Sequence, residues 1–181
     1  MTVPERIHTD LRDLARYQES VETWARLLER ADPHYAAISV RDNTTGTGAF
    51  GGALEANKKI IKAFDVLGPS RGAVAILEQG IIRIDRAGVY IVAVLPASFS
   101  GGAAKTYAYG VYKDGGAEIL PGLHGHRVIG TGGDVGAAGM LAPVQLAAGD
   151  ELGVYFWCED GTQEVVFEDG CFCAIGVPDA A

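Results

Sequence analysis

Two histidines separated by one glycine come nearest to a metal-binding pattern in this chain. In an extended segment, His124 and His126 would project to the same side, because side chains alternate along a strand. Imidazole nitrogens suit zinc, copper, iron and nickel, and three copies near an axis would present six of them. The surrounding residues 120–136 are rich in glycine, however, which predicts an exposed loop. We therefore favour a solvated loop over a metal site and expect no cofactor.

The three cysteines, Cys158, Cys171 and Cys173, could in principle do redox or nucleophilic chemistry. Their odd number argues against a framework of disulfides. Cys171 and Cys173 share one face of a predicted strand among apolar neighbours, so we expect buried thiols that act as small hydrophobes. A reactive thiolate would need an electropositive setting, whereas Glu168 and Asp169 stand immediately upstream.

No pattern typical of an enzyme is found in the sequence. It has no Ser-His-Asp order, no Walker loop and no HExxH motif. The glycine-rich residues 130–133 lack the Lys-Ser/Thr pair of a phosphate loop. The acidic pairs at 159–160 and 168–169 flank predicted turns, where solvated carboxylates are the usual case and a calcium site is the alternative. We expect a protein that is not an enzyme.

Composition narrows the possible partners. The chain has 181 residues, of which 25 are glycine, and its 15 basic against 23 acidic residues give a net charge of −8. Without a cluster of Lys and Arg, nucleic acid and anionic membranes are not expected partners. No apolar run is as long as a membrane span, and the first residues lack the apolar stretch of a signal peptide. We expect synthesis in a cytosol.

Residues 1–33 predict one amphipathic helix, over 4–31. Thr2 and Glu5 have the spacing of a capping box, Pro4 lies in the first turn, and Asp32 with Pro33 ends the helix. One face follows alternating steps of four and three, which is a heptad seam. The seam consists of Ile7, Leu11, Leu14, Gln18, Val21, Ala25 and Leu28.

Three roles for this seam remain open. The helix could pack on its own β domain, associate with copies of itself, or dock into another protein. Gln18 is the one polar layer, of the kind that can determine register or oligomer number. Three heptads are barely enough for an independent coiled coil, so self-association would need contacts of the following domain as well.

From residue 34 to 181 the apolar period changes to two, which predicts an all-β domain. Glycine-containing turns at 114–116, 160–161 and 169–170 are of the hairpin type. No helical period interrupts the region, so a parallel β-α-β fold is not expected. The predicted strands are 35–40, 60–65, 73–77, 80–85, 88–96, 106–113, 127–129, 140–146, 151–159, 163–167 and 171–177.

Two of these strands, 88–95 and 152–158, are apolar on both faces. An antiparallel strand that faces solvent should be polar at every second residue, so a second cover is needed. That cover could be another sheet, the N-terminal helix or a neighbouring subunit. We expect the following residues to form the core and the strands of an oligomer: Tyr90, Val92, Tyr107, Tyr109, Tyr155, Phe156, Trp157 and Phe172.

Three segments resemble the C1q and tumour-necrosis-factor jelly-roll family. Residues 80–92 (GIIRIDRAGVYIV) are similar to its middle strands, which read apolar/polar and then Gly-x-Tyr-x-Phe, with Val92 where the family usually has Phe. Residues 144–154 (VQLAAGDELGV) are similar to its Leu-x-x-Gly-Asp-x-Val strand pair. Residues 171–177 (CFCAIGV) stand in place of its closing Phe-x-Gly-Phe-Leu strand, with the aromatics partly kept. Order and spacing agree over about residues 36–178.

The resemblance implies an antiparallel sandwich that forms homotrimers around an axis lined with apolar and aromatic side chains. From this architecture we expect a structural protein of a tailed bacteriophage, a capsid decoration or short head fibre on the virion surface. The helix would attach it to other virion proteins. The alternatives are a receptor-binding module of a tail fibre, which would bind a host-surface glycan or protein, and a bacterial C1q-like ligand-binding protein. A depolymerase is a more remote alternative.

Overall fold

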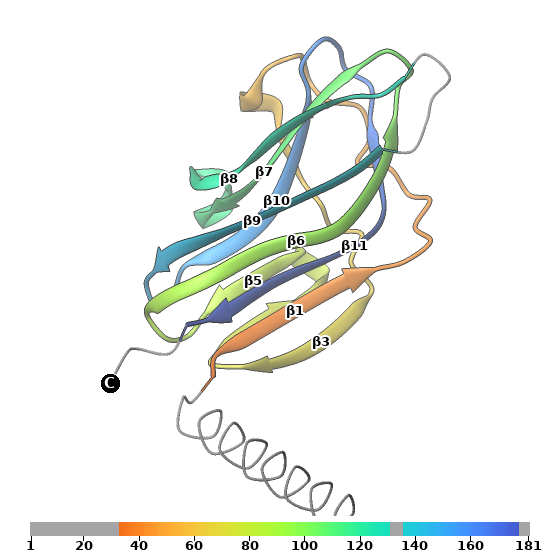
Figure 1. The fold of residues 1–181 in the computed structure, drawn as a ribbon. Coiled ribbons are helices and arrows are strands. Elements are labelled where there is room, and N and C mark those ends of the chain that lie inside the picture. The colour runs from red at the N-terminus through yellow and green to blue at the C-terminus, as the bar shows by residue number, and fades with distance from the viewer. Residues whose placement is uncertain (1–32, 131–135, 178–181) are drawn as a thin grey trace, which may run out of the picture. The chain divides into compact units, whose positions relative to one another are not determined.

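The structure is a computed structural model that describes residues 33–130 and 136–177, and its strands form two antiparallel sheets (Figure 1). The five-stranded sheet has the order β3-β1-β11-β6-β9, and the six-stranded sheet has the order β4-β5-β10-β7-β8, with β2 paired to β10. The first sheet consists of β3 (Val66–Arg71), β1 (Tyr35–Val40), β11 (Val165–Gly176), β6 (Gly88–Gly101) and β9 (Gly136–Leu146). The second consists of β4 (Ala73–Ile76), β5 (Ile81–Ile84), β10 (Glu151–Cys158), β7 (Thr106–Lys113), β8 (Glu118–Val128) and β2 (Lys59–Ile60). Three short 3-10 helices complete the fold: η1 (Glu55–Asn57), η2 (Leu77–Gln79) and η3 (Asp114–Gly116).

The prediction of an all-β antiparallel fold is confirmed. The predicted helix and its seam from Ile7 to Leu28 lie outside the described residues. His34–Val177 form one compact unit. The division of the chain into residues 1–33 and 34–181 stays a prediction.

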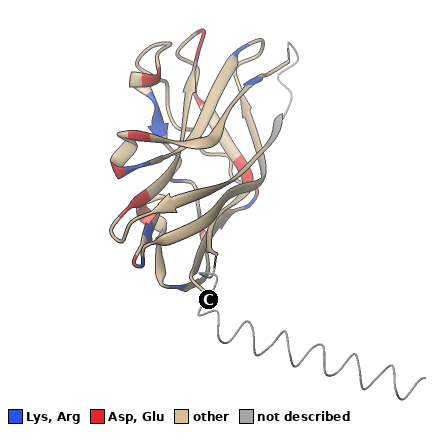
Figure 2. Ribbon diagram, turned by 60° about the vertical axis from the view of Figure 1, so that its left-hand side comes forward, with Lys and Arg blue, Asp and Glu red and all other residues tan. Residues whose placement is uncertain are grey.

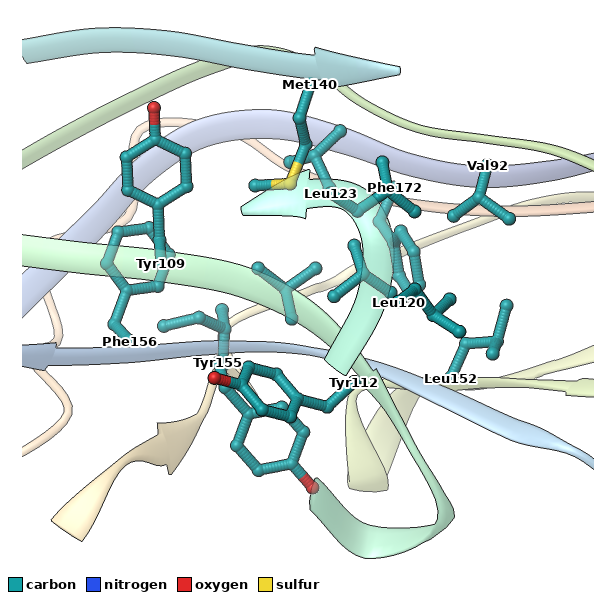
Figure 3. Packing of buried hydrophobic residues seen from close by; sticks show 14 of the residues in the cluster. Val92, Tyr109, Tyr112, Leu120, Leu123, Met140, Leu152, Tyr155, Phe156 and Phe172 are labelled. Atoms are coloured by element: carbon teal, nitrogen blue, oxygen red, sulfur yellow. The ribbon is translucent and has the colours of Figure 1, made fainter. Parts of the chain in front are cut away.

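Alternation of apolar residues explains why the strands form and which way they face. In β1 every second side chain, Ala36, Ile38 and Val40, is buried between the sheets. The inward side chains of both sheets meet in one core (Figure 3). Phe156 of β10 lies at its centre, 5.1 Å from the ring of Phe99 on β6 and 5.4 Å from that of Tyr109 on β7, measured between ring centroids.

The prediction of an exposed loop at 120–136 is wrong for residues 120–128, which belong to β8. This strand pairs with β7, and Leu120 and Leu123 are buried. The register shifts opposite Gly110 and Tyr112, and Gly122 has a φ of 75°. The bulge disrupts the period of two that would have marked the strand in the sequence.

Two of the predicted turns differ from the structure. Asp169 and Gly170 do not form a hairpin turn but lie within β11, where the pairing with β6 shifts register on both sides of them. Gly161 follows β10 and connects it to β11 in the other sheet, so this turn is a crossover instead of a hairpin. The turn in η3 joins the paired neighbours β7 and β8, as predicted.

The early strands were also predicted incorrectly. Of the strand predicted at 60–65, only Ile60 lies in a strand, the two-residue β2, and no strand is predicted where β3 lies. β3 contains Gly68 and Pro69, which weaken a strand signal. Proline is tolerated there because β3 lies at the edge of its sheet, where some N–H groups have no strand to pair with.

Candidate functional site

On the outward side of the five-stranded sheet, the four strands β1, β11, β6 and β9 carry a row of apolar side chains. Strand pairing places Ile175 opposite Ile91, and Ile91 opposite Pro143. We call this surface the apolar face and define it by Tyr35, Ala37, Val89, Ile91, Leu95, Leu141, Pro143, Cys173 and Ile175.

The apolar face is exposed in the single chain. Leu141 is 56% exposed, Ile175 49% and Leu95 43%. On β6, the outward residues from Val89 to Leu95 include no charged side chain. The described residues that pair with them on β9 and β11, and the partners of those on β1, are also uncharged. Contiguous apolar surface of this kind is typical of interaction sites.

The eight residues predicted for the core and the oligomer strands, seven aromatics and one valine, lie inside the chain. All eight are at most 8% exposed: Tyr90, Val92, Tyr107, Tyr109, Tyr155, Phe156, Trp157 and Phe172. None of them therefore belongs to the exposed apolar face. The residues that do, such as Ile91 and Leu141, were not selected from the sequence, although Ile91 belongs to the second apolar set of the strand at 88–95.

The two strands with two apolar faces have different covers. On β10, the second face includes Tyr155 and Trp157, and the chain itself covers both. Tyr112 packs edge-on against their rings, and Ile60 of β2 lies opposite Tyr155. On β6, by contrast, the second face is the apolar face, which no described segment covers. Of these two strands, β6 is therefore the one whose second apolar face needs a cover from outside the described domain.

His124 and His126 stand on β8, on the outward side of the six-stranded sheet. Their ring centroids are 4.5 Å apart. His124 stacks on Trp157 at 5.6 Å between centroids, with an angle of 8° between the planes. His126 Nδ1 lies 2.8 Å from Glu159 Oε2. Both histidines are exposed, but they are held by neighbouring side chains instead of lying in a loop.

The cysteines only partly fit the prediction of buried thiols. Cys158 is fully buried, and this burial raises the pKa of its thiol. Cys171 and Cys173 are half-buried on the outward side of β11, because that side of the sheet is open. A hydrogen bond from the Cys173 thiol lowers the pKa of Cys171 to about 7, and the same interaction raises the pKa of Cys173.

The carboxylates of the predicted turns have structural partners. Asp169 accepts hydrogen bonds from the Asp42 backbone N–H at 3.0 Å and the Ser98 hydroxyl at 3.2 Å. Asp160 accepts one from the Thr106 N–H at 3.2 Å. In residues 33–130 and 136–177, no group of three or more His, Cys, Asp or Glu side chains is arranged to hold a metal ion.

Two open clefts adjoin each other and share Ser100 and Val166 in their walls. The larger, of about 540 Å³, is lined by Ala49, Ser100, Gly101, Gly102, Gln163, Glu164 and Val166. The smaller, of about 480 Å³, is lined by Asp42, Asn43, Thr44, Ser100, Val166, Glu168 and Asp169. Their polar and acidic walls would suit a hydroxyl-rich or cationic ligand.

Charged side chains are distributed over the domain without a basic cluster in view. Figure 2 shows Lys and Arg interspersed with Asp and Glu along a mostly uncharged ribbon. Several of the basic residues are paired, such as Lys113 with Glu118 at 3.1 Å. In the described part of the chain, no helix has the length and apolar character needed to cross a membrane.

Comparisons with known proteins identify the fold. No protein-family model matches the chain, and no curated protein matches it either. Among solved structures, Eiger TNF from S. frugiperda is similar with a TM-score of 0.57 and 16% identity, over 82% of this chain and 96% of that one. Murine APRIL is similar with a TM-score of 0.54 and 13% identity, over 79% of this chain and 99% of that one. The chain therefore has a TNF-like jelly-roll fold.

Proposed function

We propose that this chain is a homotrimeric TNF/C1q-like module that buries its apolar face between copies and displays the remaining surface. The observation that carries the proposal is the apolar face itself, exposed at Leu141 and Ile175 and without charged side chains. Burying such a surface stabilises the assembly by about 25 cal/mol for each Å² of apolar area that is removed from water. It also leaves no charge unpaired, so association has little electrostatic cost.

A cyclic trimer requires that the apolar face meets a different surface of the next copy, because only twofold interfaces join identical patches. β9 is the edge strand beside this face and itself carries Leu141 and Pro143. In the proposed trimer, β9 of one copy packs on the face of the next, a head-to-tail contact that forms a closed ring when the rotation between copies is one third of a turn. This arrangement would also cover the free edge of β9.

Multi-angle light scattering of the full chain tests the oligomer. We expect a mass of about 57 kDa at micromolar concentration, three times the 19.0 kDa of one chain. A mass of one chain under these conditions would contradict the proposal, and a mass of two chains would replace the trimer with a dimer.

As its place of action we propose the surface of a tailed-bacteriophage particle, as a capsid decoration or short head fibre. The support is the heptad seam of residues 7–28 joined to a module suited to trimers, which together would make an anchor and a displayed head. The genes next to the coding sequence provide the cheapest test. We expect capsid genes there. Tail genes would instead indicate that the protein belongs to a tail fibre.

A ligand-binding role is the second candidate, either at a tail-fibre tip or in a bacterial C1q-like protein. The observation that favours it is the pair of adjoining clefts with polar walls around Ser100 and Val166. Screening the chain on a glycan array distinguishes the two roles. Binding that is lost in Glu164→Ala, with the trimer intact, would favour ligand binding over decoration.

A further inference from the structure

We propose that His124 and His126 form a two-imidazole binding site for a divalent transition-metal ion of the nickel, copper or zinc type. Both side chains project from β8 on the outward side of the six-stranded sheet, since strand pairing places them opposite Gly110 and Ala108. This is the side of the sandwich away from the apolar face. The site does not overlap the apolar face that the proposed trimer would bury.

The ring of His126 is oriented by a carboxylate. An ionised carboxylate only accepts hydrogen bonds, so the 2.8 Å contact with Glu159 Oε2 places the proton on His126 Nδ1. The neutral ring then has its lone pair on Nε2, which is free to bind a metal. A carboxylate behind a ligating imidazole is the usual outer-shell partner in metal sites, where it selects the tautomer and makes the nitrogen more basic.

The ring of His124 is held by stacking. Its plane lies 8° from that of Trp157, with 5.6 Å between the centroids, and Trp157 is only 5% exposed. The indole is a rigid support, because Tyr112 packs against it from another strand. Holding both imidazoles in place reduces the conformational entropy that metal binding would cost.

The separation of the two rings fits a shared ion. With a metal–nitrogen bond of about 2.1 Å and a ring radius of about 1.2 Å, two adjacent imidazole ligands have centroids about 4.7 Å apart in octahedral geometry and about 5.4 Å apart in tetrahedral geometry. The centroids of His124 and His126 are 4.5 Å apart, close to the octahedral value. Since no third protein ligand is in place within the described residues, water would complete the coordination. Imidazole pairs of this kind favour nickel, copper and zinc over magnesium or calcium.

Isothermal titration of the full chain with Ni²⁺ tests the site. We expect one ion per chain, and at least tenfold weaker binding in His124→Ala and in His126→Ala. Glu159→Gln keeps both ligands but replaces the carboxylate, so it should weaken binding about tenfold. Electron paramagnetic resonance of the Cu²⁺ complex should show two nitrogen ligands in the original chain and one in each histidine variant.

Two controls separate this site from other ligands in the chain. His34→Ala should leave Ni²⁺ binding unchanged, because His34 precedes β1 and does not belong to the pair. The double variant Cys171→Ser, Cys173→Ser should also bind normally. Binding that survives in both histidine variants but disappears in the cysteine variant would assign the ion to the thiols and overturn the proposal. Failure to bind Ni²⁺ at millimolar concentration would overturn it as well.

Discussion

At the scale of single residues, burial separates the core aromatics from the histidines of β8. Tyr90 is fully buried, and its hydroxyl donates a hydrogen bond to the Arg86 carbonyl at 2.7 Å. Phe156 is 1% exposed and lies beside Tyr109 in the core (Figure 3). The histidines are exposed, so their removal leaves no cavity.

Replacing either core aromatic with alanine should therefore destabilise the domain severely. Tyr90→Ala and Phe156→Ala should each cost about 3–5 kcal/mol through lost burial and the resulting cavity. That loss corresponds to a fall in melting temperature of about 10 °C or more. In metal-free protein, His124→Ala and His126→Ala should cost less than about 1 kcal/mol. Thermal unfolding followed by circular dichroism measures all four, and equal losses in both pairs would contradict the assigned core.

In the single chain, where the outward side of β11 is open, the thiol of Cys171 should react with iodoacetamide faster than that of Cys158. The reactive species is the thiolate, and the hydrogen bond from Cys173 lowers the pKa of Cys171 to about 7. Its labelling rate should accordingly rise as the pH increases from 6 to 8, with a midpoint near 7. Burial raises the pKa of Cys158 and restricts access to it, so that residue should remain largely unlabelled.

Peptide mass spectrometry after timed labelling gives both rates. The matched control is Cys173→Ala, which removes the hydrogen-bond donor and should move the midpoint of Cys171 upwards, towards the ordinary value of about 8.5. A midpoint that is already near 8.5 in the original chain would show that the two thiols do not interact in solution.

At the scale of elements, strands with an unbroken alternation were predictable from sequence and interrupted strands were not. The predicted 35–40 and 106–113 coincide with β1 and β7. Only the end of β8 falls in a predicted strand, 127–129, because the bulge at Gly122 disrupts the alternation before it. β11 is divided in two by the prediction because it contains Asp169 and Gly170, which are typical of turns. Such residues act as turns or as bulges depending on the neighbouring strand, which a local sequence pattern does not specify.

The candidate site was predictable only in part for a related reason. The sequence shows that 88–95 and 152–158 are apolar on both faces. It does not show that Tyr112 and Ile60, which are distant in sequence, cover the second face of β10 while that of β6 stays open. The pairing of His126 with Glu159 is likewise a long-range contact between two elements. Contacts of this kind depend on the tertiary arrangement.

Removing residues 1–33 should leave the jelly roll folded, because His34–Val177 form one compact unit. The truncated chain should keep its β-sheet circular dichroism and a cooperative melting transition. If residues 4–31 are the anchor, it should no longer attach to the particle that the full chain decorates. Co-sedimentation with that particle is the measurement, and undiminished binding of the truncated chain would assign attachment to the β domain.

At the scale of the whole molecule, the account depends on what covers the apolar face. A trimer that buries this face would cover the unpartnered side of β6, while the histidines of β8 lie on the outward side of the other sheet. It would also place Ile91 and Leu141 in an interface, where a carboxylate would be buried without a partner. Association should accordingly be sensitive to charge on this face and insensitive to charge elsewhere.

The most direct measurement is light scattering of a double variant, Ile91→Glu with Leu141→Glu, beside the original chain. The account predicts about 57 kDa for the original chain and about 19.0 kDa for the variant, with unchanged circular dichroism. Val128→Glu is the matched control, because Val128 is 64% exposed on β8, in the other sheet, and its replacement should leave three chains associated. If the double variant stays folded and still has the mass of three chains, the apolar face is not the interface and the central claim is contradicted.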